Sequence, residues 1–179
     1  MPKVRTRYRV KLRDSLDREQ MEKKLKLAMG SDHHGVTWKA KILDAFGEQY
    51  EIQDFGPASA EASCDYPDYA REVAAAVSQK SVDRGILICG SGVGMAITAN
   101  KFSGVRAAVC ESVEAATLTR QHNNINVLCL SGTVWQQKDL LPVVQAFLET
   151  EFEGGRHQRR IDKINEIEKT CGCFSRGES

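Results

Sequence analysis

The chain has 179 residues, of which 41% are apolar and 27% are charged. This is enough for one compact domain with a hydrophobic core that needs no disulfide bonds. The net charge is only +1, which argues against a nucleic-acid binder that relies on bulk charge. No apolar run approaches the roughly 20 residues that cross a bilayer, so no membrane association is expected. The first residues lack the apolar stretch of a secretory signal, and we expect a cytoplasmic protein.

Positive charge is concentrated at the N-terminus. Residues 1–13 contain six Lys or Arg and no acid, so the rest of the chain is mildly acidic. We interpret residues 1–24 as a basic extension, either solvated or paired with a sheet edge through its alternating apolar residues. A mitochondrial presequence is a weaker alternative, because the segment is poor in serine and runs into an acidic stretch.

The six cysteines are expected to be reduced thiols, because no signal peptide directs the chain to an oxidising compartment. A structural zinc site is not expected, since no pair of C-x-x-C motifs exists. Cys110 and Cys129 lie in apolar runs and are interpreted as core residues. Cys171 and Cys173 fall in a predicted C-terminal tail, residues 169–179, where an unstructured end is expected and a thiol metal clip is the alternative.

Short apolar runs alternate with segments of helical periodicity between residues 25 and 150. The runs, which we predict to be strands, cover residues 25–29, 50–52, 85–89, 105–110 and 127–130. Helical spacing appears around residues 38–46, 70–77 and 140–148, and a last helix is predicted over 156–169. The alternation predicts an α/β fold whose parallel sheet is covered on both faces. In such a sheet, ligands bind at the carboxyl ends of the strands.

A glycine-rich loop follows the third predicted strand, with Gly90, Gly92 and Gly94 at alternate positions. Such a loop lets the backbone approach a ligand, and its amides at a helix N-terminus favour an anion. It matches neither the Walker motif nor the dinucleotide-binding pattern. Cys89 directly precedes it, so the helix dipole should favour its thiolate and let it act as a base or nucleophile. A buried core cysteine is the alternative.

Two further strand ends carry acids. Asp32 and His33 follow the first predicted strand and offer a carboxylate and a donor to a polar ligand, unless Ser31 or Asp32 only caps a helix. Glu111 follows the fourth strand, 17 residues after Gly94, which is near the spacing of a ribose-binding acid in a dinucleotide fold. An acid in the first turn of the next helix is the more ordinary interpretation.

Two groups near the end of the sequence are suited to a phosphorylated substrate. His122 and Asn123 form a candidate proton donor with an orienting amide in a polar loop, and a plain turn is the alternative. Arg156 and Arg160 are four residues apart, so they share one helix face and suit a phosphate monoester. A basic surface turn would explain either arginine alone.

Five segments occur in an order that resembles a known family: SDHHG, DYPDYA, GILICGSGVGMAITANK, RQHNNINVL and EFEGGRHQRRI. Together they resemble the ribose/galactose isomerase family, type B ribose-5-phosphate isomerases in particular, over residues 25–168. The resemblance implies a Rossmann-like α/β/α sandwich and an obligate homodimer with shared active sites. It also implies interconversion of ribose 5-phosphate and ribulose 5-phosphate without metal or cofactor. Whether two dimers pair as a tetramer stays open.

The resemblance assigns a role to each candidate at the first cluster. Cys89 matches the base that moves a proton between two carbons, and the amides of Gly90, Ser91, Gly92, Val93 and Gly94 match the loop that stabilises the enediolate. Ser91 stands where threonine is more usual. Asp32 and His33 match residues that contact the sugar and the phosphate. The chemistry is reasonable, since a proton next to a carbonyl needs a base and the oxyanion needs preorganised donors.

The resemblance also assigns the later residues. His122 matches the acid that opens the furanose ring, with Asn123 beside it, and in the family this segment reaches the site from the partner subunit. Arg156 and Arg160 match the phosphate clamp. One departure stands out, because Thr133 replaces an arginine that helps many relatives hold the ligand. We therefore expect weaker phosphate binding or compensation by another basic residue.

Two other functions remain open from the sequence. The first is an isomerase of a different sugar phosphate, such as a hexose 6-phosphate, which a side-by-side assay of aldose phosphates would distinguish. The second is a non-catalytic module that binds nucleotides or nucleic acid through the basic extension. Cys89, His122 and the two arginines argue against this second function.

Overall fold

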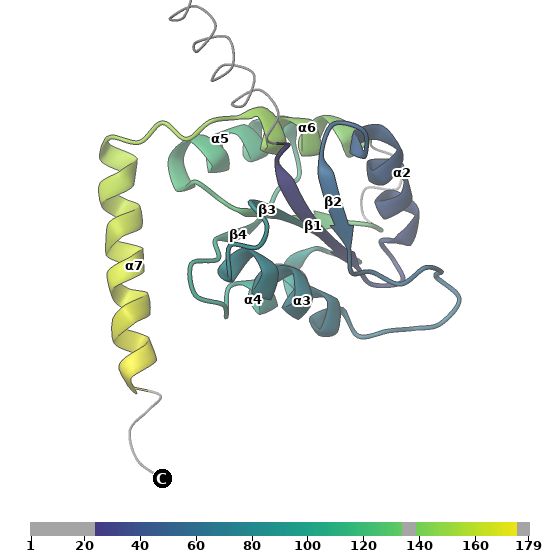
Figure 1. The fold of residues 1–179 in the computed structure, drawn as a ribbon, viewed down its shortest axis with the longest axis horizontal. Helices are drawn as coiled ribbons and strands as arrows, with labels where there is room; N and C mark the ends of the chain where they lie inside the picture. Colours follow the sequence, from purple (N-terminus) through teal and green to yellow (C-terminus); the bar gives the residue numbers. More distant parts are fainter. Residues whose placement is uncertain (1–23, 134–138, 175–179) are drawn as a thin grey trace, which may run out of the picture.

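The computed structural model describes residues 24–133 and 139–174 of the chain, so the predicted basic extension lies almost entirely outside the described residues. Within them the chain forms a five-stranded parallel sheet in the order β2-β1-β3-β5-β4 (Figure 1). The strands are β1 (Lys26–Ser31), β2 (Glu51–Asp54), β3 (Arg84–Cys89), β4 (Ala107–Val109) and β5 (Val127–Ser131). All four pairings are parallel. The predicted α/β fold with a five-stranded parallel sheet is confirmed.

Helices cover both faces of the sheet, as a Rossmann-like sandwich requires. The helices are α2 (Val36–Phe46), α3 (Tyr66–Ser78), α4 (Val93–Ala99), α5 (Val113–Asn123), α6 (Leu141–Glu149) and α7 (Arg156–Phe174). The first face is packed by α2, α5 and α6 and the second by α3 and α4, which Figure 1 shows above and below the strands. No helix in the described part of the chain is long and apolar enough to span a membrane.

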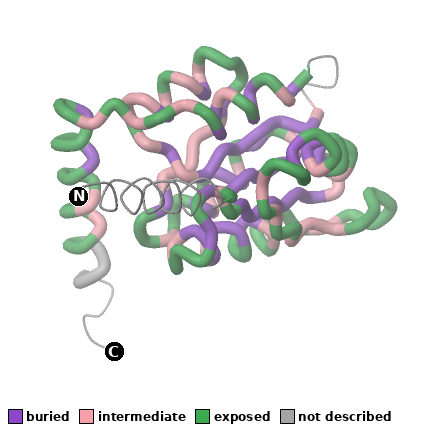
Figure 2. The backbone as a smooth tube through the Cα atoms, turned by 45° about the horizontal axis from the view of Figure 1, so that its top comes forward, coloured by how far each residue is buried: buried purple, intermediate pink, exposed green. Residues whose placement is uncertain are grey.

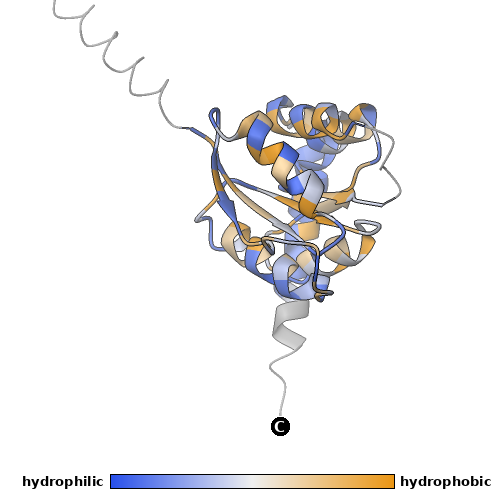
Figure 3. Cartoon of the chain, turned by 90° about the vertical axis from the view of Figure 1, so that its right-hand side faces the viewer, coloured by the Kyte–Doolittle hydropathy of each residue, from blue (hydrophilic) through white to orange (hydrophobic). Residues whose placement is uncertain are grey.

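Each face of the sheet has its own hydrophobic core, and alternate residues of a strand point to one core or the other. In β3, Ile86 and Ile88 pack with α2 and α6, whereas Leu87 and Cys89 face α3 and α4. This two-residue period follows from the pleat of a strand, and burial on both faces explains why the runs are continuously apolar. Figure 2 shows the buried segments mainly in the middle of the molecule, and Figure 3 shows hydrophobic and hydrophilic segments alternating along the flanking helices. Cys89 therefore belongs to the α3–α4 side of the sheet.

Several boundaries differ from the predicted ones. β1 continues to Ser31, which is registered with Ile88 of β3, so Ser31 is a strand residue and not a helix cap. α5 runs to Asn123, so the prediction of a polar loop around His122 is wrong; the helix ends where Asn124 adopts a left-handed conformation with φ of 46°. α7 continues to Phe174, past the predicted start of the C-terminal tail.

Helix α7 crosses one end of the layers and has few contacts with the rest of the chain (Figure 1). The carboxylate of Glu168 accepts hydrogen bonds from the amide of Gly104 at 2.9 Å and from the hydroxyl of Ser103 at 3.1 Å. A cavity of about 590 Å³ remains between α7, the end of α3 and the loop before β4. Ile164 and Ile167 of α7 are 50% and 62% exposed, so part of its apolar surface is uncovered in a single chain.

Two buried arginines tie α6 to the body. Arg84 at the start of β3 donates to the carbonyl oxygens of Phe147 and Leu148 at 2.5 and 2.8 Å. Arg120 of α5 donates to the carbonyl of Thr150 at 3.2 Å. Burial lowers the pKa of Arg84, and it lowers the pKa of Arg120 to about 10, so both remain cations at neutral pH. The guanidinium groups thus satisfy carbonyls that the last turn of α6 leaves unpaired.

We predict that Arg84→Met lowers the free energy of unfolding by about 2 kcal/mol, because it leaves two carbonyl oxygens of α6 without a donor. Denaturant unfolding measures this change. Arg71→Met is the matched control, since Arg71 pairs with Glu72 on the exposed surface of α3. It should change the free energy of unfolding by less than about 0.5 kcal/mol. Equal effects of the two substitutions would contradict the proposed anchor.

Candidate active site at the carboxyl edge of the sheet

Three adjacent strands end at one edge of the sheet, and their loops are bound to one another. The amide of Asp32, after β1, donates to Ile88 of β3 at 3.1 Å, and the amide of Gly132, after β5, donates to Cys89 at 2.7 Å. The order of strands reverses between β1 and β3, which is where open α/β sheets bind ligands. The predicted site residues gathered at this edge are Asp32, His33, Cys89, Gly90, Ser91, Gly92, Val93 and Gly94.

Cys89 is the last residue of β3 and is 4% exposed. Its Sγ accepts a hydrogen bond from the amide of Gly92 at 3.1 Å. Gly92 precedes α4 with a φ of +77°, and a Cβ there would lie 3.1 Å from the backbone of Leu130, so glycine is required on both counts. An N–H group directed at the sulfur can stabilise the negative charge of a thiolate.

The rest of the glycine loop is more open. Ser91 and Val93 are exposed, and the hydroxyl of Ser91 accepts a hydrogen bond from the amide of Val93 at 3.3 Å. A Cβ on Gly94 would lie 2.5 Å from the ring of Tyr66, so this glycine is needed for the close approach of α3. Tyr66 begins α3 and is 39% exposed. Sequence reasoning quoted its motif, DYPDYA, but assigned this aromatic residue no place in the site.

Cysteines elsewhere in the sheet differ from Cys89. Cys110 and Cys129 are fully buried, and burial raises the pKa of both thiols, most strongly for Cys129. Both are free, as are Cys64 and Cys89. This confirms the interpretation of Cys110 and Cys129 as core residues. Among these four thiols, Cys89 is the one that stands at the glycine loop and accepts a hydrogen bond from it.

Asp32 and His33 are each held by a backbone amide. Asp32 is 4% exposed, and its carboxylate accepts a hydrogen bond from the amide of His34 at 2.9 Å. Nδ1 of His33 accepts a hydrogen bond from the amide of Cys64 at 3.3 Å. The neutral imidazole must then carry its proton on Nε2, where it can donate to a ligand. Cys64, which the sequence did not single out for the site, belongs to the loop between β2 and α3.

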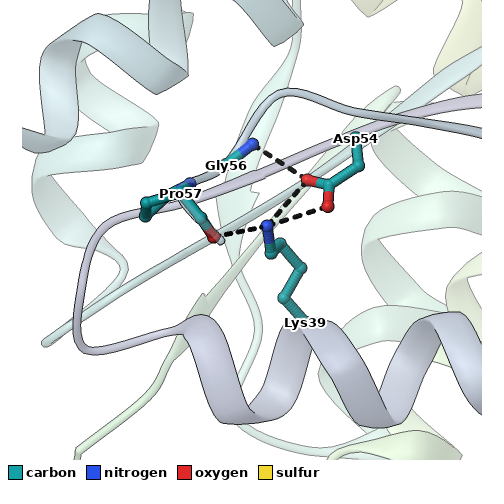
Figure 4. A network of polar contacts seen from close by, with 4 residues as sticks. All are labelled: Lys39, Asp54, Gly56 and Pro57. Carbon is teal, nitrogen blue, oxygen red and sulfur yellow. Dashed lines mark hydrogen bonds and ion pairs between the residues drawn. The ribbon is translucent and has the colours of Figure 1, made fainter. Parts of the chain in front are cut away.

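A buried lysine holds this loop in place (Figure 4). Lys39 of α2 is 4% exposed, and its ammonium group donates to the carboxylate of Asp54 at 2.8 and 3.0 Å and to the carbonyl of Pro57 at 2.8 Å. Asp54 also accepts from the amide of Gly56 at 2.9 Å. The three protons of the ammonium group are thus all used. The anchored loop continues to Cys64, whose amide binds Nδ1 of His33 and so orients its ring.

A second group of predicted residues does not join this edge. α5 starts after the carboxyl end of β4 and returns to the amino end of β5, so His122 and Asn123 lie at the opposite edge of the sheet from Cys89. The ring of His122 stacks on that of His157 with centroids 4.3 Å apart and planes at 5°. Arg156 and Arg160 stand in the first turns of α7, the helix that carries His157.

Glu153 and Arg156 set the charge of the second group. A carboxylate oxygen of Glu153 lies 3.6 Å from Nε2 of His157 and 4.0 Å from Nε2 of His122. Burial, together with His122 and Arg156, lowers the pKa of His157, so its ring is neutral near pH 7. Its Nε2 can therefore accept the hydrogen bond from Arg156, at 3.2 Å. Glu153 and His157 lie within the EFEGGRHQRRI segment, but the sequence analysis assigned neither of them a role in the site.

The arrangement of the second group favours an anion over a cation. His122, Glu153 and His157 place potential metal ligands within 4.8 Å of one another. The donor from Arg156 already occupies Nε2 of His157, and a guanidinium beside the cluster would repel a metal ion. The same guanidinium suits a phosphate group.

A sheet of this topology with a thiol in a glycine loop and a separate cationic group is typical of an α/β enzyme that acts on a phosphorylated ligand. The comparison with protein families is consistent with that class, because residues 27–164 match the model described as Ribose/Galactose Isomerase. The chain belongs to the ribose/galactose isomerase family.

Curated relatives support the same assignment. The chain is 48% identical over 143 residues to the probable ribose-5-phosphate isomerase B of Mycoplasma genitalium, a match that covers 79% of this chain and 94% of that protein. It is 46% identical over 145 residues to ribose-5-phosphate isomerase B of Escherichia coli, covering 80% of this chain and 97% of the relative. The resemblance to type B ribose-5-phosphate isomerases is confirmed.

Solved structures confirm the Rossmann-like fold. Ribose-5-phosphate isomerase B of Clostridium thermocellum matches with a TM-score of 0.78 and 46% identity, over 82% of this chain and 99% of that one. The enzyme of Mycoplasma genitalium with bound ribulose-5-phosphate matches with a TM-score of 0.77 and 47% identity, over 81% and 97% of the two chains.

We predict that Lys39→Met lowers the free energy of unfolding by about 2 kcal/mol, because it leaves the carboxylate of Asp54 and the carbonyl of Pro57 without their donor. Denaturant unfolding measures the change. Lys41→Met, on the exposed surface of the same helix, is the matched control and should have less than about a quarter of this effect. A Lys39→Met protein as stable as the Lys41→Met protein would show that the anchor contributes little.

Proposed function

We propose that the protein is an aldose–ketose isomerase that interconverts ribose 5-phosphate and ribulose 5-phosphate. The observation that carries this proposal is the sulfur of Cys89, which is held by the amide of Gly92 at 3.1 Å within the glycine loop. It stands in a chain that is 46–48% identical to ribose-5-phosphate isomerases B. One structural neighbour holds ribulose-5-phosphate.

In the proposed reaction, the thiolate of Cys89 takes a proton from the carbon next to the substrate carbonyl and returns it to the neighbouring carbon. Negative charge then develops on the oxygens of an enediolate. Amides of the loop from Gly90 to Gly94, including those of Ser91 and Val93, stabilise that charge. Asp32 and His33 orient the sugar, and Nε2 of His33 is available as a donor. No step of this mechanism needs a metal or a cofactor.

We propose that the site is completed by a second copy of the chain. Within one chain, His122 lies at the opposite edge of the sheet from Cys89. Val93 and Ile97 of α4, beside the glycine loop, are 50% and 58% exposed. Exposed apolar residues next to an incomplete site favour a symmetric homodimer that buries them. The partner would then bring its His122 to the reacting sugar.

The second group would act on the ring and the phosphate. His122 protonates the ring oxygen and opens the furanose, with Asn123 beside it to orient the substrate. Arg156 and Arg160 bind the phosphate, which positions the reacting carbons from a distance. We also propose a cytoplasmic enzyme, because the free thiol on which the mechanism depends requires a reducing compartment.

One observation keeps a different sugar phosphate in consideration. The hydroxyl of Thr133, which stands where many relatives have an arginine, donates to the carbonyl of Gly90 at 2.5 Å and supplies no charge to the ligand. A site with one cation fewer can prefer another aldose phosphate. Parallel assays on ribose 5-phosphate and hexose 6-phosphates decide between the two substrates.

We predict that Cys89→Ser lowers kcat for ribose 5-phosphate by about 10³-fold, because a serine hydroxyl does not ionise near neutral pH and so cannot replace the thiolate base. A coupled assay measures the loss, and calorimetry should show that ribulose 5-phosphate still binds. Cys110→Ser, an equal change at a buried thiol away from the loop, controls for general damage and should reduce kcat by less than about threefold. Full turnover by Cys89→Ser would refute the proposed base.

The shared site predicts complementation between inactive chains. Cys89→Ser and His122→Ala proteins should each be nearly inactive alone. When they are unfolded, mixed and refolded together, half of the dimers contain one chain of each kind, and each mixed dimer has one intact site. The mixture should then recover about a quarter of the activity of the unaltered protein. If each chain holds a complete site, the mixture shows only the sum of the two residual activities.

A further inference from the structure

The carbonyl oxygen of Gly90, directly after Cys89, accepts three hydrogen bonds from the loop that follows β5. The hydroxyl of Ser131 donates at 2.6 Å, the hydroxyl of Thr133 at 2.5 Å and the amide of Thr133 at 3.3 Å. The preceding carbonyl, of Cys89, is held by the amide of Gly132 at 2.7 Å. Two successive peptide groups of the glycine loop are therefore fixed by one short segment of the chain.

This arrangement determines where the next amide points. The carbonyl of Gly90 and the N–H of Ser91 belong to one planar peptide group, in which they point in opposite directions. The carbonyl faces the loop after β5, and β3 lies between β5 and β1 in the sheet. The N–H of Ser91 is therefore directed toward the side of β1, where Asp32 and His33 stand. This N–H belongs to the second residue after Cys89, whose sulfur is the proposed base.

We propose that Thr133, together with Ser131, is a positioning residue that aims the amide of Ser91 at the oxygen of the enediolate. This inference rests on the isomerase function proposed above. The three donors restrict rotation of the Gly90–Ser91 peptide, so the N–H needs no reorganisation when negative charge develops. They also polarise the peptide group, because hydrogen bonds in a chain strengthen one another. The amide of Ser91 stabilises the transition state most, because the oxygen carries the most negative charge there.

The hydroxyl of Thr133 is committed to the glycine loop and is not available to a ligand. A threonine hydroxyl has a single proton, and here that proton is donated to Gly90, so the side chain cannot also donate to a substrate phosphate. The residue that stands in place of a ligand-binding arginine therefore supports the loop from behind. Beside the weaker phosphate binding expected from the missing arginine, this position would then affect the rate of the chemical step.

The test compares Thr133→Val, which removes the hydroxyl at nearly constant volume, with Thr133→Ser, which keeps it. Thr133→Val should lower kcat for ribose 5-phosphate about 10-fold while KM changes less than about twofold, because the hydroxyl acts on the transition state. Thr133→Ser should recover most of the loss. Thr170→Val is the matched control, since the hydroxyl of Thr170 also donates to a carbonyl, that of Glu166, on the exposed surface of α7.

A second measurement separates positioning from a merely structural role. Two inhibitors are titrated, a hydroxamate phosphate that mimics the charge of the enediolate and a pentitol 5-phosphate that has no carbonyl. Thr133→Val should weaken binding of the hydroxamate about 10-fold and leave the pentitol phosphate within about twofold. Equal weakening of both, or a wild-type kcat in Thr133→Val, overturns the inference.

If Thr133→Val does not fold, Ser131→Ala removes a different donor to the same carbonyl and must show the same selective loss of hydroxamate affinity. An active wild-type enzyme with unaffected variants disproves the positioning role alone. A wild-type protein that neither converts ribose 5-phosphate nor binds either inhibitor disproves the isomerase function, and the inference with it.

Discussion

The hydrogen bonds that join the ends of β1, β3 and β5 are the constraint on which the site depends. Backbone bonds continue past the last residue of each strand, from Asp32 to Ile88 and from Gly132 to Cys89. Because the strands are parallel and adjacent, three loops start at nearly the same level of the sheet. A thiol, a carboxylate and a set of amides are brought together, and hydrogen bonds between the loops, such as those from Ser131 and Thr133 to Gly90, hold them in place.

Hydrogen bonds from buried polar groups fix the loops at this edge, which the hydrophobic core does not hold. Lys39 anchors the segment that reaches His33, and Ser131 and Thr133 hold the segment that follows Cys89. Each donor is buried or partly buried and meets a carbonyl or a carboxylate, so the energetic cost of leaving water is offset by defined partners. These bonds have direction, which apolar contacts lack, and direction is what orienting an amide or an imidazole requires.

The sheet also explains why one chain holds two separate groups of functional residues. A helix that follows a parallel strand must run back to the start of the next strand, and α5 therefore carries His122 away from the edge where Cys89 stands. The cations and the stacked imidazoles at the far edge have the chemistry that the proposed phosphate site requires. The proposed homodimer would bring the two groups together, since each copy could offer its far edge to the other.

The sequence by itself determined the class of the fold and the residues of the glycine loop. Continuous apolar runs separated by helical periodicity follow from local geometry, and the loop from Gly90 to Gly94 is recognisable by its alternating glycines, of which Gly92 has a φ of +77°. The ends of strands and helices were harder to place, as Ser31 and His122 show, because a boundary depends on which neighbour continues the hydrogen bonding. Lys39 and Cys64 lie outside the recognised motifs, and Glu153 and His157 lie within EFEGGRHQRRI without a role that the sequence assigned. Only the tertiary structure decided their roles, because each acts through a partner that is distant in sequence or through a ring or carbonyl whose direction is fixed by packing.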